Sequence, residues 1–289
     1  MLWFFLAISV ASLQSVKDVY NKTQLKNFDE YITTCSLAFF TSLFLSPLLF
    51  LIGIPQLGNN FWFALLVTGL LDAIAYTFYL RAIKISDLSI IAPITTFSPL
   101  FLLITSPLIV GEFPQPLGII GVLLIVIGSY LLNLRQKQQG YLAPFQAIIT
   151  DEGSRLALLV AFVWSISANF DKVGVQNSSP IFWVVCVFFT VSILLLPIVL
   201  YKSHHNLSKL KTGGWKLIIY GMINSVAMGC QMVAINLTFV AYVISVKRTS
   251  ALFSVFLGKI ILKEKGIKER LLGAAIMVSG VFLITISQR

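Results

Sequence analysis

The chain has 289 residues, of which 57% are hydrophobic and only 11% are charged, and its mean hydropathy is +0.91. A soluble core does not need this much apolar material, so the composition excludes an ordinary soluble domain and predicts an all-α integral membrane protein. Lys and Arg number 21 against 11 Asp and Glu, a net charge of +10. In a membrane protein this excess indicates loops that face anionic lipid, so the lipid bilayer is the expected partner and nucleic acid is not.

Ten apolar runs are continuous over about 18 or more residues, the length of a membrane-spanning helix, whereas lipid-exposed strands would alternate with period two. The apolar start of the chain is interpreted as the first span, because it lacks the positive segment of a signal peptide. The runs form two groups of five, namely 2–19, 31–52, 61–83, 86–110 and 116–134, followed by 156–175, 181–200, 215–237, 238–262 and 268–286. The polar stretch between the groups predicts a first repeat at 1–134, a linker at 135–155 and a second repeat at 156–289.

The two groups share a sequence pattern. An offset of 152 residues lays 82–132 on 234–284, so that Glu112 falls on Glu264, Gly121 on Gly273 and Gly128 on Gly280. A span-ending glutamate followed by two glycines seven residues apart is more specific than matching apolar letters. Because each half has an odd number of spans, the second half must enter the membrane in the opposite orientation. The sequence therefore predicts ten transmembrane helices as two inverted five-helix repeats, an architecture of transporters.

These features resemble a known family. The two glutamates, the glycine-spaced last span of each half, and the stretches 169–183 (NFDKVGVQNSSPIFW) and 242–250 (YVISVKRTS) are similar to the EamA group of the drug/metabolite transporter superfamily. The resemblance covers nearly the whole chain. It implies a multi-pass protein of the plasma membrane that carries small metabolites by alternating access, but it does not imply a particular substrate.

A basic pair, Lys247 and Arg248, lies within the ninth predicted span. A helix restricted to 249–262 would rise about 21 Å, short of the roughly 30 Å hydrocarbon core. The pair is therefore expected within the membrane thickness, where Arg248 could bind an anionic substrate group through its planar fork and Lys247 as a point charge. The alternative is an interfacial loop from which both side chains reach the headgroups.

Asp72 lies near the centre of the third predicted span, and the 152-residue offset places Asn224 at the same position of the eighth. A charge at this depth costs about 2.5–3.5 kcal/mol on insertion scales and is retained where it has partners or water. Three roles stay open for Asp72: a proton-coupling carboxylate, a counter-charge to Lys247 or Arg248, or a hydrogen-bonded group at a helix contact.

Other polar and aromatic residues could line a transport pathway. Gln14 and Lys17 of the first span take places that correspond to polar residues of the sixth if Lys17 is laid on Lys172, which suggests that both spans line a cavity. The alternative, favoured for Asp171 and Lys172, is end-of-helix polarity at headgroup level. Tyrosines near span ends are often interfacial. The further candidates for the pathway are Trp164, Asn169, Gln231 and Tyr79, with Tyr76 and Asn236 as additional possibilities.

Prolines, glycines and glutamates predict structural roles. Pro93, Pro99 and Pro107 favour a fourth span that bends beside the pathway. The repeated glycines give each last span a flat stripe, which predicts close packing between the fifth and tenth spans or a homodimer contact. Glu112 and Glu264 are expected to be anchors that pair with a basic residue or cap the next helix.

The positive charges predict one orientation and the family resemblance another. Fifteen Lys and Arg residues fall in the loops after odd-numbered spans, and only Lys172 and Arg289 fall on the other side. The positive-inside rule then makes the odd loops cytoplasmic and both termini external. The resemblance implies cytoplasmic termini instead, so the orientation stays open.

The motifs of enzymes are missing from the sequence. There is no P-loop, no HExxH and no spaced Cys/His set, so no catalytic residues, no metal site and no cofactor are predicted. Cys35, Cys186 and Cys230 lie in apolar runs and are expected to be small buried hydrophobes. His204 and His205 are expected in a solvated loop. The repeated halves favour a carrier, by secondary transport or export, of an amino-acid-like or other small polar or amphipathic solute; the alternatives are an intramembrane enzyme acting on lipid and a channel or assembly subunit.

Overall fold

The computed structural model describes residues 1–24, 28–86, 88–133, 143–253 and 267–287, and within these ranges the regular structure is entirely helical. The first half contains α1 (Leu2–Gln24), α2 (Glu30–Leu45), α3 (Leu48–Ile52), α4 (Phe61–Ile85), α5 (Leu88–Thr95), α6 (Ser98–Ile109), α7 (Pro116–Asn133) and α8 (Ala143–Thr150). The second contains α9 (Glu152–Gln176), α10 (Pro180–Lys202), the 3-10 helix η1 (His204–Lys209), α11 (Leu210–Leu237), α12 (Val240–Lys247) and α14 (Ile267–Ser287).

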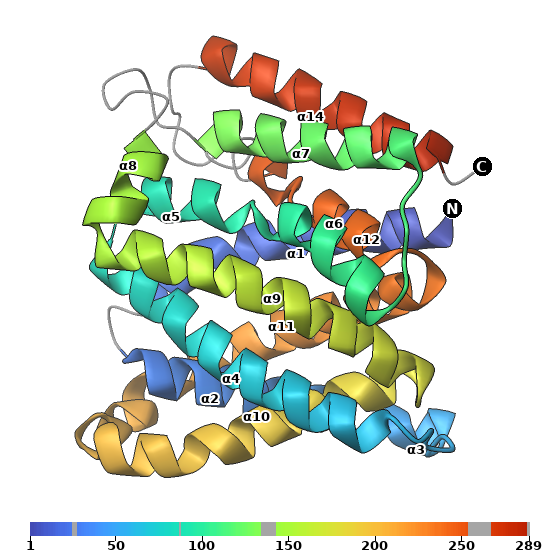
Figure 1. Ribbon diagram of the computed structural model, residues 1–289. Helices are drawn as coiled ribbons and strands as arrows, with labels where there is room; N and C mark the ends of the chain where they lie inside the picture. The colour runs from blue at the N-terminus through green and yellow to red at the C-terminus, as the bar shows by residue number, and fades with distance from the viewer. Residues whose placement is uncertain (25–27, 87, 134–142, 254–266, 288–289) are drawn as a thin grey trace.

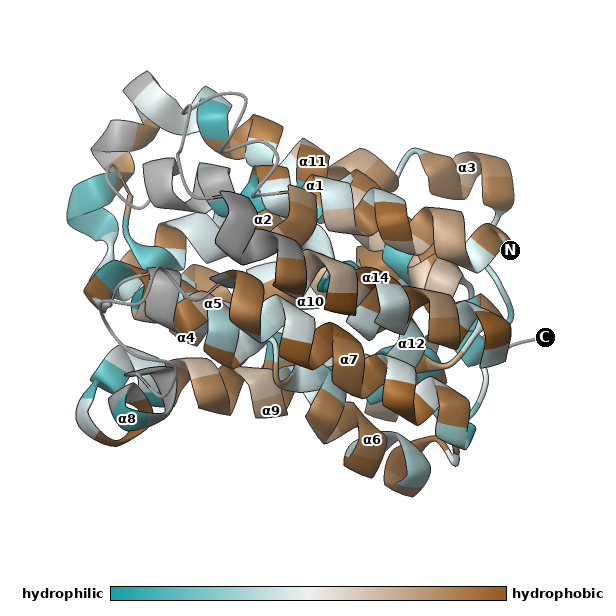
Figure 2. Cartoon of the chain, turned by 90° about the horizontal axis from the view of Figure 1, so that it is seen from above, coloured by the Kyte–Doolittle hydropathy of each residue, from teal (hydrophilic) through white to brown (hydrophobic). Residues whose placement is uncertain are grey.

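Many of these helices are long and apolar enough for a membrane. Among the described residues there are six such stretches, and two shorter apolar helices cover Pro116–Leu132 and Leu272–Ser287. Figure 2 shows hydrophobic residues along α6, α7 and α14. Large side chains such as Phe50, Leu108 and Trp62 are exposed on the outside of the bundle, which suits contact with lipid rather than water. The prediction of an all-helical membrane protein is confirmed.

The two halves have the same helical pattern in opposite orientations. Helix α4 ends at Ile85 and α11 ends at Leu237, an offset of 152 residues. The same offset carries α5 onto α12. In Figure 1, α4 and α11 run in opposite directions along the bundle, as do α7 and α14. The bundle thus has a termini end, where α1 begins and α14 ends, and a linker end, where α8 lies.

Both half-helices α5 and α12 end in a two-residue break at equivalent positions. Thr96 donates its backbone N–H to Pro93, three residues back, and Phe97 donates to Ile94. Arg248 and Thr249 repeat this pattern with Ser245 and Val246. The first break was predicted as a proline-induced bend, and Pro99 has no N–H to continue α5. The second break has no proline and was not predicted.

The glycine stripes bring α7 and α14 into backbone contact. A Cβ on Gly121 would lie 2.7 Å from the carbonyl oxygen of Gly280, and a Cβ on Gly128 would lie 2.6 Å from that of Gly273. The pairing is crossed, since the first glycine of one helix meets the second of the other. This is the pattern of an antiparallel pair with a local twofold axis, and it confirms the predicted packing of the fifth and tenth spans.

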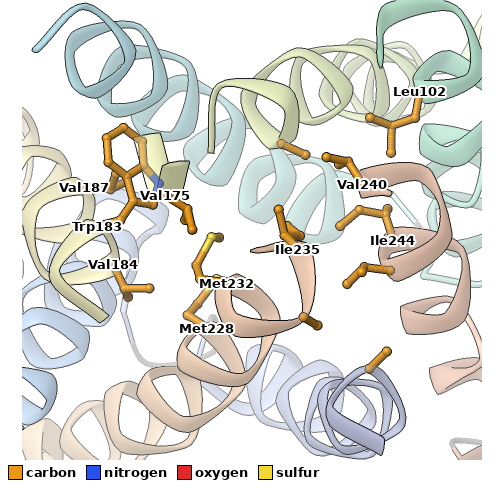
Figure 3. Close-up of a cluster of buried hydrophobic side chains, with 14 of the residues drawn as sticks. Leu102, Val175, Trp183, Val184, Val187, Met228, Met232, Ile235, Val240 and Ile244 are labelled. Atoms are coloured by element: carbon orange, nitrogen blue, oxygen red, sulfur yellow. The ribbon is translucent and has the colours of Figure 1, made fainter. Parts of the chain in front are cut away.

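A large apolar core lies beside the polar residues described below. Figure 3 shows part of it, where side chains from α10, α11 and α12 converge with Leu102 of α6 and Val175 of α9. The labelled members from α10 to α12 are Trp183, Val184, Val187, Met228, Met232, Ile235, Val240 and Ile244.

The helix bounds differ from the predicted spans at several points, and four spans show the largest differences. The second span is interrupted at Ser46 and Pro47. The fourth and ninth are interrupted at the breaks described above. The sixth begins at Glu152, four residues earlier than predicted, because Asp151 accepts a hydrogen bond from the Ser154 N–H and caps the helix.

Candidate functional site

The two helix breaks face each other. Arg248 is the first residue of the second break, and its Nη2 donates to Oγ of Ser98, the first residue of α6, at 2.6 Å. Lys247 ends α12, and its Nζ donates to Oε1 of Gln231 on α11 at 2.8 Å. The Arg248 Nε is buried and has no hydrogen-bond partner among the described residues. The basic pair therefore lies inside the bundle, and the Arg248 Nε–H is an unused hydrogen-bond donor there.

A third cation approaches from α1. Lys17 is 3% exposed and donates to the Asn224 side-chain oxygen at 2.6 Å. Asn224 in turn donates to Thr41 of α2 at 2.8 Å. Asp18, the next residue of α1, accepts hydrogen bonds from Gln14 at 2.8 Å and from the Tyr79 hydroxyl at 3.5 Å.

Two further carboxylates lie on α4 and α9. Asp72 is 7% exposed and accepts a hydrogen bond from Ser167 at 2.7 Å. Asp171 is also buried and accepts from the Trp183 indole N–H at 2.8 Å. The equivalent positions of the two repeats thus differ in charge: Asp72 is an acid beside a neutral serine, whereas Asn224 is a neutral amide beside Lys17.

We name six of these residues the central charge cluster. Asp18 lies within electrostatic range of Lys17, Lys247 and Arg248. Asp72 lies within electrostatic range of Lys247. Asp171 lies within electrostatic range of both Asp72 and Lys247. In the described part of the chain, no direct ion pair joins any two members of the cluster. The cluster consists of Lys17, Asp18, Asp72, Asp171, Lys247 and Arg248.

A second buried charge site is fully paired, in contrast to the central charge cluster. Glu112 contacts the Lys172 ammonium at 3.0 Å, and their side chains are 9% and 8% exposed. Buried charges without a partner are costly, so a protein that needed charge only for architecture would pair it in this way. The central charge cluster instead keeps three charges of each sign apart, an arrangement that suits a charged or dipolar ligand.

Aromatic rings lie next to the acidic side of the cluster. Trp164 of α9 packs against Tyr76 and Tyr79 of α4, with ring centroids 5.7 and 5.1 Å apart. All three are partly buried. The two tyrosines are therefore not lipid-facing belt residues in this fold, and Tyr79 joins the rings to Asp18.

Of the predicted pathway residues, the structure brings most together and separates two. Lys247, Arg248, Asp72, Gln231 and Tyr79 belong to or contact the central charge cluster, and so do Asn224 and, through Tyr79, Trp164. Asn169 is fully buried, and its amide bonds Thr105, Ser106 and its own helix. It fastens α9 to α6. Asn236 is exposed and lies outside the cluster.

Asp171 and Lys172 are buried near the end of α9, each 6% exposed. Trp183 and the α11–α12 turn cover the last turns of this helix. Their expected place at headgroup level stays a prediction. At the 152-residue offset that relates α5 to α12, Lys17 falls on Asn169 rather than on Lys172.

Sequence reasoning missed Asp18 and underrated Lys17 and Asp171. Gln14, Lys17 and Asp18 follow the i, i+3, i+4 spacing of a single helix face. That spacing was a usable signal for a polar stripe on α1. Nothing in the sequence near Asp171 indicates its indole partner.

The other assigned groups are accounted for as follows. Glu112 is an anchor that pairs with a basic residue, as predicted, but it caps α12 rather than the next helix. Glu264 lies outside the described residues. The three cysteines are free and partly buried. His204 and His205 are exposed in η1, and no group of His, Cys, Asp and Glu in the described ranges could hold a metal ion.

An inverted repeat whose broken helices meet at buried charges defines the chain as a membrane transport protein. The family model described as "EamA-like transporter family" matches residues 1–134 and 152–286. The chain belongs to this family, which is part of the drug/metabolite transporter superfamily.

Comparison with solved structures supports the fold. One, described only as "Crystal structure of protein", is 15% identical, with a TM-score of 0.74 over 99% of this chain and 96% of that chain. At this identity the likeness shows the fold alone. No curated protein matches the sequence.

Proposed function

We propose that the protein is a plasma-membrane carrier that moves a small polar or amphipathic metabolite, such as an amino acid or a related acid, by alternating access. Transport is secondary, coupled to a solute or ion gradient or operating as export. No catalytic step is part of this function.

The observation that carries the proposal is the central charge cluster at the meeting point of the two breaks. Three cations and three acids are held within electrostatic range without direct pairing. A solute with a carboxylate would accept hydrogen bonds from the unused donors of Arg248 and Lys247. An ammonium group on the same solute would be attracted to Asp72 and Asp171. The rings of Trp164 and Tyr76 offer an apolar surface for the rest of the molecule.

The proposed architecture has ten spans in two repeats, 1–134 and 156–289, joined by 135–155. The fourth and ninth spans are the broken helices, and the cluster lies between the repeats. In the empty carrier, Asp72 is the counter-charge of Lys247. The position of Asp72 within electrostatic range of Lys247 supports this role. When cargo binds, its own charges replace these interactions.

The test uses purified protein in proteoliposomes with a panel of labelled amino acids, carboxylic acids and amines. We expect saturable counterflow for a solute with both charges. Arg248→Gln and Lys247→Gln should each lower uptake at least about tenfold, which corresponds to about 1.4 kcal/mol of lost binding. Arg81→Gln and Lys84→Gln are matched controls, because these cations form exposed ion pairs at the linker end.

The outcomes separate the competing classes. Flux without saturation would indicate a channel, and product formation from lipid in detergent without a gradient would indicate an enzyme. Unchanged transport and specificity in both Arg248→Gln and Lys247→Gln would remove the basic pair from the site.

A further inference from the structure

The half-helix α12 is held at both ends by one segment of the first repeat. At its C-terminal end, Arg248 donates to Ser98, where α6 begins. At its N-terminal end, the Val240 N–H donates to Glu112 Oε2 at 2.8 Å, three residues after α6 ends. Helices α6 and α12 are therefore antiparallel and joined at each end. We call this arrangement the α6–α12 clamp.

The N-terminal joint of the clamp is a saturated network. Lys172 donates to the carbonyl oxygens of Ile235 and Thr238 at 2.7 and 2.8 Å, in addition to its 3.0 Å contact with Glu112. All three ammonium protons and both carboxylate oxygens are thus used. The charges also suit their places, since the carboxylate lies at the positive N-terminal end of α12 and the ammonium at the negative C-terminal end of α11.

This network joins the two repeats. Glu112 belongs to the first repeat, whereas its partners Lys172 and Val240 belong to the second. It lies at the termini end, where α9 and α11 end and α12 begins (Figure 1). Alternating access moves one repeat against the other around a central site, so contacts between repeats at one end must separate when that end opens.

The clamp also connects this joint to the candidate site. Helix α12 has eight residues and is about 12 Å long, with Lys247 and Arg248 at its far end. Residues 240–246 are all buried, so the helix can shift only as a unit. A solute that replaces Ser98 as the partner of Arg248 therefore breaks the joint at the C-terminal end of α12. The resulting shift of the helix weakens the hydrogen bond between Val240 and Glu112 at its N-terminal end.

We propose that Glu112 and Lys172 form a latch that holds the termini end closed, and that α12 links this latch to solute binding at Arg248. The proposal rests on the carrier function above and adds a gate to it. Glu112 and Lys172 are positioning residues: Lys172 follows Asp171 in the chain, but in the described structure neither side chain forms a hydrogen bond or ion pair with a member of the central charge cluster.

Unlike a simple ion pair, the latch requires the acid and the base at their own positions, because each also bonds backbone groups. Glu112 accepts a backbone N–H, and Lys172 donates to two carbonyls. In the exchanged variant E112K/K172E, the introduced ammonium would face the Val240 N–H, and the introduced carboxylate would face the carbonyls of Ile235 and Thr238. Restored charge attraction should therefore not restore the closed gate.

The test measures access to α12 from the termini end. Ser245 is fully buried. Among the described residues, its hydroxyl bonds the Ala241 carbonyl of its own helix and no other group, so Ser245→Cys is a nearly isosteric reporter. It is introduced after the three native cysteines are replaced by serine, in protein that stays folded. A membrane-impermeant maleimide is applied from the side of the termini in proteoliposomes. Glu112→Gln should raise the labelling rate at least about fivefold, the lower range of allosteric coupling.

Three further variants make the result decisive. Glu152→Gln removes the same charge from an exposed pair at the linker end and should leave labelling unchanged. The exchanged variant E112K/K172E should label as fast as Glu112→Gln. Ser98→Ala removes only a hydroxyl at the other joint and should also raise labelling, which keeps the proposal testable if Glu112→Gln does not fold.

Two results would overturn the latch. One is labelling that stays at the parent rate in folded Glu112→Gln and Ser98→Ala proteins. The other is an exchanged variant that returns to the parent rate, which would reduce the contact to simple charge attraction. Labelling needs no transport, so a parent protein without counterflow would refute the carrier function while leaving the gate measurement valid.

Discussion

The contact between α7 and α14 predicts that an added methyl group at Gly121 or Gly128 of α7 destabilises the protein. In Gly128→Ala the new Cβ would lie 2.6 Å from the Gly273 carbonyl oxygen and 2.5 Å from the Met277 side chain. Gly121→Ala meets the Gly280 carbonyl at 2.7 Å. Backbone cannot move aside as a flexible side chain can, so the helices must separate.

The size of the effect follows from overpacking. Inserting one carbon into a well-packed contact costs about 1–3 kcal/mol. At about 2–4 °C per kcal/mol for chains of 150–250 residues, a loss of about 2 kcal/mol lowers the melting temperature by about 4–8 °C. The measurement is the apparent melting temperature in one detergent at a fixed scan rate, because membrane proteins commonly unfold irreversibly.

Gly214→Ala is the matched control for this prediction. Gly214 lies in α11, and the nearest atom to its added Cβ is the Leu210 Cβ at 4.0 Å. The same substitution there should stabilise the helix by about 0.5–1 kcal/mol, because alanine loses less conformational freedom than glycine. If Gly128→Ala melts at or above the parent temperature, the close approach of the two helices is refuted.

Three other predictions test separate features. Lys172→Met leaves Glu112 buried without its cation and should cost about 3–5 kcal/mol, whereas Lys84→Met, at an exposed pair, should cost about 0–1 kcal/mol; equal melting temperatures would contradict the contrast. Burial raises the pKa of Asp151, but hydrogen bonds from Ser154 and Ser86 outweigh it and leave the pKa below its usual range. The cap of α9 should therefore stabilise the protein above the ordinary aspartate pKa and weaken as pH falls through the lowered value, a pH dependence of melting that Asp151→Asn should remove. A reporter fused after Arg289 should be active only outside the cytoplasm if loop charge sets the orientation, and cytoplasmic activity would reverse the assignment of the termini end.

The sequence was most informative where the two repeats match. The 152-residue offset, the glycines and Glu112 predicted the inverted architecture and the α7–α14 contact, because repeated residues at fixed spacing reflect repeated geometry. Pro93 and Pro99 predicted the first break for a local reason, the missing N–H. These signals depend only on neighbouring residues or on the comparison of one half with the other.

The parts that were missed depend on contacts between distant segments. Arg248 begins a break without a proline, and only the fold shows that Ser98 receives its side chain. Lys172 seemed to be close to the end of a helix, yet its three partners come from two other segments of the chain. Spacing along one helix cannot reveal such pairings.

The crossed glycine contact also bears on how this molecule could have arisen. Gly121 meets Gly280 while Gly128 meets Gly273, and each pair consists of non-equivalent members of the duplicated segment. A half-length polypeptide with this helix would already carry a surface complementary to itself, because a twofold axis needs only one kind of face. Two such halves inserted in opposite senses would bury the same glycines against each other, so gene fusion would have preserved an existing joint and created no new one.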